Sequence, residues 1–90
     1  MTARTYRVRG RVQGVGFRYF VIRLGRSCGV RGAVRNEADG SVTAVAEGEE
    51  EALARFRAGL ESGPPAARVT GVEEREAAGR PVALEYDATF

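Results

Sequence analysis

The hydrophobic period of this chain changes from two residues to about 3.6 across a short glycine-rich segment near the N-terminus. Residues 5–12 alternate between apolar and arginine side chains, which predicts a half-buried strand. Residues 13–16 contain two glycines and predict a loop. The apolar side chains that follow recur at helical spacing: Phe17, Phe20, Val21, Leu24 and Cys28. This switch predicts a strand, a tight loop and a helix that ends at Gly29.

The rest of the chain alternates between extended and helical patterns in the same way. Residues 30–36 and 41–47 read as strands, and the sequence Ala-Asp-Gly at 38–40 predicts a hairpin between them. A second helix is predicted after the acidic run 49–51, because acids suit the positive end of a helix. Its apolar stripe consists of Leu53, Phe56 and Leu60.

Gly63, Pro64 and Pro65 predict the end of that helix. Residues 68–76 then read as a last strand, and residues 82–86 as a shorter extended tail. The order strand, helix, strand, strand, helix, strand is that of the ferredoxin-like split βαβ fold. We therefore expect an α+β sandwich, in which two helices cover one face of an antiparallel sheet. Ninety residues are enough for one domain, so residues 1–90 are expected to form a single unit.

Several residue types are absent, and their absence excludes whole classes of chemistry. The chain has no histidine, which removes histidine-based acid–base catalysis, histidine metal ligands and Ser-His triads. It also has no lysine, which excludes a Walker-type phosphate loop and Schiff-base mechanisms. Cys28 is the only cysteine, so we interpret it as a small apolar residue rather than a nucleophile. Glu73, Glu74 and Glu76 are interpreted as solvated acids, and no metal-ligand cluster is visible.

The charges divide the chain into two unequal parts. Residues 1–36 contain nine arginines and no acid, whereas residues 37–90 contain five arginines and twelve acids. This asymmetry favours a binding site for an anion in the first part. Alternatively, the acidic part simply neutralises the basic part within one fold, and both readings can hold together.

The segment from Gly10 to Arg18 is the best candidate for a functional site. Consecutive backbone N–H groups in such a loop can converge on one anion, and the helix N-terminus behind the loop adds positive partial charge. Arg18 would lie in the first helical turn, where its charge opposes the helix dipole unless an anion binds there. The alternatives are a tight turn without a ligand and an ordinary solvated arginine.

Asn36 is the second candidate. It ends a predicted strand, carries no charge that would repel an anion, and could orient a water molecule through its amide. Asparagine is also a common turn residue, and spacing alone favours that interpretation.

The stretch Val8–Arg18 (VRGRVQGVGFR) resembles the signature of the acylphosphatase family. Residues 32–36 followed by 39–42 resemble its second motif, and residues 46–48 and 63–65 fall where the family has similar residues. The resemblance implies a hydrolase that cleaves acyl phosphates without a metal or other cofactor. It implies that Arg18 binds the phosphoryl oxygens and that Asn36 positions the attacking water. The loop donors would be the backbone N–H groups of Gln13, Gly14, Val15, Gly16 and Phe17.

The expected partner is a small-molecule acyl phosphate, and we expect a cytoplasmic monomer that binds neither nucleic acid nor membrane. The sequence lacks a signal peptide and an apolar run of about 20 residues. An RNA-binding module is the main alternative, but the strand at 30–36 contains no aromatic residue for base stacking. A domain of a larger carbamoyl-transfer protein is a third hypothesis. The chain ends at Phe90 without a further domain, which favours a free enzyme.

Overall fold

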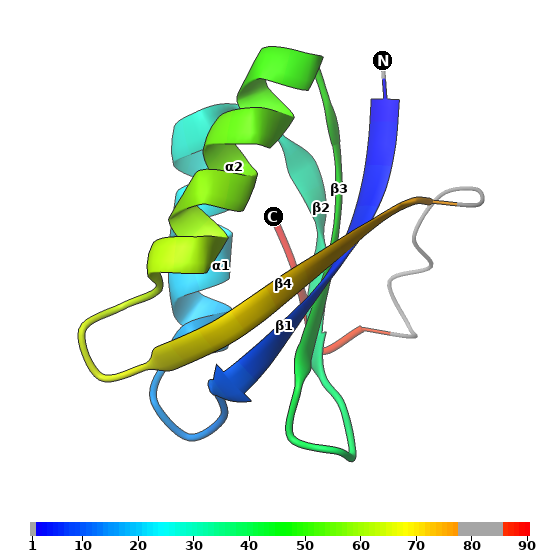
Figure 1. Ribbon diagram of the computed structural model, residues 1–90. Coiled ribbons are helices and arrows are strands. Elements are labelled where there is room, and N and C mark those ends of the chain that lie inside the picture. Colours follow the sequence, from blue (N-terminus) through cyan, green and yellow to red (C-terminus); the bar gives the residue numbers. More distant parts are fainter. Residues whose placement is uncertain (1, 78–85) are drawn as a thin grey trace.

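The computed structural model describes residues 2–77 and 86–90, and it places two helices against one face of an antiparallel sheet (Figure 1). The described elements, in chain order, are β1 (Thr2–Arg11), α1 (Phe17–Cys28), β2 (Arg31–Asn36), β3 (Val42–Gly48), α2 (Glu50–Ser62), β4 (Arg68–Glu76) and β5 (Ala88–Thr89). The strand order across the sheet is β4-β1-β3-β2-β5. This arrangement confirms the ferredoxin-like fold that the sequence pattern predicts.

Both helices end where glycine predicts that they end. The backbone of Gly29 after α1 is left-handed, with φ at 77°, and its N–H bonds to the carbonyl of Arg26. Gly63 follows α2 with φ at 68°. The two helices have 12 and 13 residues, so no helix in the described part of the chain could cross a membrane.

The strand β5 was not predicted. It consists of two residues at the sheet edge, where Ala88 pairs with Val34 and Thr89 with Ala33 of β2. Two residues are too few to give a hydrophobic period, so no sequence pattern could identify them. The predicted tail at 82–86 lies outside the described residues except for its last residue. Figure 1 shows the short final segment beside β2, far in sequence from the strand that it pairs with.

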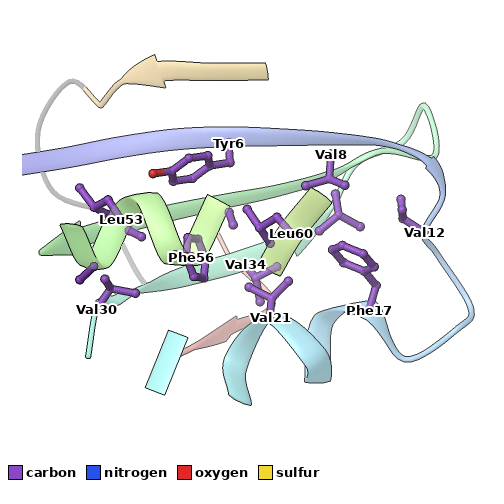
Figure 2. Close-up of a cluster of buried hydrophobic side chains, with 14 residues drawn as sticks. Tyr6, Val8, Val12, Phe17, Val21, Val30, Val34, Leu53, Phe56 and Leu60 are labelled. Carbon is purple, nitrogen blue, oxygen red and sulfur yellow. The ribbon is translucent and has the colours of Figure 1, made fainter. Parts of the chain in front are cut away.

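The core lies between the helices and the sheet (Figure 2). Tyr6 of β1 and Phe56 of α2 meet edge to face, with ring centroids 5.4 Å apart. Phe17, the first residue of α1, is 1% exposed and lies at the same end of the core as Val12 in Figure 2. Full burial of an aromatic or large aliphatic side chain contributes about 1.5–3 kcal/mol. Burial of Phe17 and Val12 therefore fixes both ends of the intervening glycine-rich loop.

The opposite face of the sheet carries arginines that pair with acids from the second part of the chain. Nε of Arg9 lies 2.6 Å from Oε1 of Glu73, and Nε of Arg35 lies 3.0 Å from Oε2 of Glu37. Nη1 of Arg9 also lies 3.6 Å from Oδ2 of Asp39. The charge asymmetry of the sequence is thus partly neutralised within the fold, as one of the two interpretations predicts.

Candidate active site

The loop between β1 and α1 has the backbone geometry of an anion-binding nest. Gly14 and Gly16 have φ of 74° and 77°, whereas no non-glycine residue in the described chain has positive φ. The sign of φ therefore alternates along Gly14, Val15 and Gly16, which turns successive N–H groups toward one side. A Cβ atom at either glycine would meet no atom within 4 Å. The fold thus requires these glycines for their dihedral angles and not because neighbouring protein atoms crowd them.

The N–H groups of this loop and of the first helical turn are unpaired. From Gln13 to Tyr19, no backbone N–H group has a hydrogen-bond acceptor among the described residues, and Gly16 caps α1 without a side-chain bond. The first turn of α1 also contains no acidic residue. The N-terminal end of α1 therefore carries free N–H donors and the positive end of the helix dipole, and no acidic side chain in its first turn compensates them.

The side chain of Gln13 fastens the loop to the hairpin between β2 and β3. Its Nε2 donates to the carbonyl of Glu37 at 2.7 Å and to the carbonyl of Ser41 at 3.0 Å. Sequence analysis assigned only the backbone of Gln13 and missed this role. The glutamine therefore couples the position of the loop to the hairpin that follows Asn36.

Arg18 and Asn36 come together from different elements. Arg18 lies in the first turn of α1, with its side chain 47% exposed, and Asn36 is the last residue of β2. The Oδ1 atom of Asn36 is buried and has no hydrogen-bond donor among the residues that the structure describes. A buried acceptor without a donor is rare in folded proteins, so this oxygen is a candidate contact for a bound molecule.

Asp87 contacts both residues, and no sequence pattern predicted this role. Nη1 of Arg18 lies 2.8 Å from Oδ2 of Asp87, and the backbone N–H of Asn36 donates to the same oxygen at 2.8 Å. The bond from Asn36, and after it the guanidinium of Arg18, holds the pKa of the Asp87 carboxyl below its ordinary value. The residue lies 69 positions from Arg18 and belongs to no periodic segment, so only the folded chain reveals the contact.

These residues line one cavity of about 320 Å³ at the N-terminal end of α1. Gly14, Gly16, Phe17, Arg18 and Asn36 all contribute to its wall, together with Asp87. The side chains of the other two predicted loop residues are placed differently, because Gln13 reaches the hairpin and Val15 lines a neighbouring groove. The cavity can therefore present backbone donors, one guanidinium and one free acceptor oxygen to a small anion.

The structure adds little support for the other functions considered from the sequence, namely a reactive cysteine, a metal site and an RNA-binding sheet face. Cys28 is partly buried against the core. No group of three or more histidine, cysteine or acidic side chains that could hold a metal occurs in residues 2–77 and 86–90. Tyr6 is buried, and the one large hydrophobic side chain that is exposed among these residues, Tyr19, lies on α1. The open sheet face thus lacks, in the described chain, the exposed β1 aromatic that base stacking requires.

The charge of Asp87 gives a pH-dependent contribution to stability. The ordinary pKa of aspartate is about 3.9, and the folded value is lower, so folding favours the ionised carboxylate. The contribution is fully present above about pH 4 and is lost as the pH falls through the folded pKa. Asp87→Asn should therefore lower the melting temperature at neutral pH, by no more than a few degrees because both partners are close to half exposed.

Melting curves of the parent and of Asp87→Asn, recorded from pH 7 down to about pH 3, check this prediction. The difference between the two proteins should shrink as the pH falls. A difference that stays constant over this range would mean that the charge of Asp87 contributes nothing to folding.

Comparisons with known proteins identify one family for this sequence and this fold. The sequence profile of the family described as Acylphosphatase matches residues 4–86. The chain is 46% identical over 86 residues to an acylphosphatase of Actinobacillus succinogenes, with 96% of each chain covered. Its structure superposes on the crystal structure of acylphosphatase from Bacillus subtilis with a TM-score of 0.83, 40% identity and 88% of each chain covered. It also superposes on full-length HypF in the phosphate- and nucleotide-bound form, with a TM-score of 0.79 and 31% identity, covering 96% of this chain but 11% of HypF.

Proposed function

Because this chain belongs to the acylphosphatase family and is an acyl phosphate hydrolase, we propose that the cavity at the N-terminus of α1 is its active site. The substrate would be a carboxyl–phosphate anhydride, and the products a carboxylate and inorganic phosphate. One observation carries the proposal: Gly14, Gly16 and Phe17, whose N–H groups are unpaired, line the same cavity as Arg18 and Asn36 with its free Oδ1.

The phosphoryl group binds to the nest and to Arg18. The loop N–H groups of residues 13–17 donate to its oxygens, and the helix dipole adds positive potential. Nη1 of Arg18 is directed by Asp87, and no other hydrogen bond or ion pair of the Arg18 side chain is found within the described chain. Nε and Nη2 therefore stay available for a bidentate contact to two phosphoryl oxygens. Asp87 would act as a positioning residue, since it fixes the guanidinium from the side.

Asn36 orients the attacking water. Its buried Oδ1 accepts a hydrogen bond from the water and thereby aims one lone pair of the water oxygen at phosphorus. The backbone N–H of Asn36 is held by Asp87, which keeps the end of β2 close to Arg18. A fixed water avoids part of the entropy cost of a bimolecular step.

The chemistry needs no general acid. The bond between phosphorus and the water oxygen forms while the bond between phosphorus and the acyl oxygen breaks, and the electron pair leaves with the carboxylate. A carboxylate is a stable anion at neutral pH, so it departs without a proton. The lowered pKa of Asp87 makes that carboxyl a poor base, and we propose that a phosphoryl oxygen takes the proton of the water. The remaining task is stabilisation of phosphoryl charge, which fixed donors perform well.

We further propose that residues 1–90 form one domain. We expect the protein to work in the cytoplasm as a monomer and to need no cofactor. Support for a single-domain enzyme comes from the matched lengths, because 96% of the Actinobacillus relative is covered but only 11% of HypF.

Incubation of the purified protein with acetyl phosphate tests the proposed function directly. Acetate and phosphate should be released far above the spontaneous rate, and the rate should persist in excess chelator because the charge is stabilised by protein donors. Alkyl phosphate monoesters should react slower by about 10²–10⁴-fold or more, since their alkoxide leaving groups need a proton donor that the site lacks. Comparable turnover of both substrate types would reveal a general acid, and loss of activity on chelation would contradict the mechanism.

Inorganic phosphate should bind in the same cavity as the reaction product. It should inhibit competitively and raise the melting temperature, because it binds only the folded state. At a concentration of 100 Kd the stabilisation corresponds to about 2.7 kcal/mol. Chloride at matched ionic strength serves as the control. If saturating phosphate neither inhibits nor stabilises, the loop does not hold the phosphoryl group.

A further inference from the structure

A second concavity lies beside the proposed active site, on the other flank of α1. This α1–α2 groove has a volume of about 650 Å³ and runs between α1 and the turn that follows α2. Its apolar walls are formed by Val15 and Phe20, by Leu24, and by Pro64 and Pro65. Arg23 is the one charged side chain that lines it.

The groove adjoins the catalytic cavity. Gly16 and Tyr19 line both spaces, so the two lie next to each other at the N-terminal end of α1. Residues in a helix are about 100° apart around the axis, and this spacing separates the flanks. Arg18 and Ile22 face the catalytic cavity, whereas Phe20 faces the groove. Tyr19 lies on the ridge between them.

The direction of the reaction assigns an occupant to the groove. In phosphoryl transfer, the attacking and leaving oxygens lie roughly in line with phosphorus. Asn36 lines the catalytic cavity and not the groove, so the water that it orients attacks from the β2 side of α1. The leaving carboxylate must then depart on the other side, toward the groove. We propose that the α1–α2 groove binds the acyl part of the substrate, an inference that rests on the proposed function.

The groove surface indicates the class of acyl group. Tyr19 is 66% exposed, and its ring is available beside the apolar walls that Phe20 and the two prolines supply. The guanidinium of Arg23 lies 5.7 Å from the centroid of the Tyr19 ring, a cation–π contact that holds the ring at the ridge. Apolar and aromatic surface favours an uncharged, bulky acyl group. The preferred substrates are therefore aromatic or branched acyl phosphates over acetyl phosphate.

A substrate series with groove variants tests this inference. Values of kcat/KM are measured for acetyl, benzoyl and succinyl phosphate with the parent, with Ser27→Trp and with Arg26→Trp. Ser27 is exposed and lines the groove, so tryptophan there fills it, whereas Arg26 is exposed but lines neither space. Melting curves establish that both variants are folded. Differences in intrinsic substrate reactivity cancel when each variant is compared with the parent.

The parent should prefer benzoyl phosphate to acetyl phosphate by about tenfold or more, which is the discrimination that an apolar pocket gives for added apolar atoms. Ser27→Trp should reduce this preference at least severalfold, because kcat/KM falls more for benzoyl phosphate than for acetyl phosphate, and Arg26→Trp should change neither value. Three results would overturn the inference but not the proposed active site: equal kcat/KM for the acyl phosphates, a preference for succinyl phosphate, or a preference for benzoyl phosphate that Ser27→Trp leaves intact. If the parent hydrolyses none of the acyl phosphates, the proposed active site is wrong as well.

Discussion

Replacement of Arg18 by lysine should reduce kcat/KM for acetyl phosphate by about 10²–10³-fold. Lysine keeps the positive charge but has no planar fork, so it loses the bidentate contact to two phosphoryl oxygens. The contact exists in the ground state and strengthens as charge develops, so both kcat and the apparent affinity should fall. Steady-state kinetics and phosphate titration by calorimetry measure the two effects separately.

The structure supplies the control for this substitution. Lysine can still pair with Asp87, which accepts a single contact from Nη1 in the parent, so the local fold should persist. Arg26→Lys makes the same chemical change on an exposed position of the same helix that does not line the cavity, and it should leave activity unchanged. A folded Arg18→Lys enzyme with full activity would remove the guanidinium clamp from the mechanism.

The sequence predicted the elements that depend on local chain chemistry. Alternation in β1, helical spacing in α1, and the glycines at 29 and 63 identified most boundaries to within a residue or two. The strand at 68–76 was predicted with the bounds that the structure has. These signals are strong because each element buries one face, so its apolar period is imposed by the core. The assignment of Arg18 and Asn36 stays a prediction, although the fold brings both to one cavity.

The features that sequence analysis missed all depend on distant contacts. Asp87 reaches Arg18 from 69 positions away, and the side chain of Gln13 reaches carbonyl groups 24 and 28 positions away. Gly25 is a similar case, because a Cβ atom there would lie 2.3 Å from the ring of Phe90. No local propensity reports such contacts, since each joins segments that are far apart in the sequence and meet only in the folded chain. The contacts of Asp87 and Gln13 also join the elements that carry the candidate site residues.

The most informative variant is Asn36→Ala, which should separate catalysis from phosphate binding. The side-chain amide is proposed to contact the water and not the phosphoryl group, so its loss should affect the chemical step alone. We expect kcat to fall by about 10²-fold or more, while the Kd for phosphate stays within a small factor of the parent value. The kinetic signature is thus a loss in kcat with little change in binding, opposite to the combined loss expected at Arg18.

The geometry of Asn36 makes this experiment interpretable. The bond to Asp87 comes from the backbone N–H of Asn36, so alanine retains it, and circular dichroism should report an unchanged fold. Asn36→Asp is the matched variant, because it keeps an acceptor oxygen for the water but adds a negative charge. It should weaken phosphate binding through like-charge repulsion, an effect that alanine cannot produce. If folded Asn36→Ala hydrolyses acetyl phosphate with near-normal kcat, the free Oδ1 has no role in the reaction and Asn36 is only the residue that ends β2.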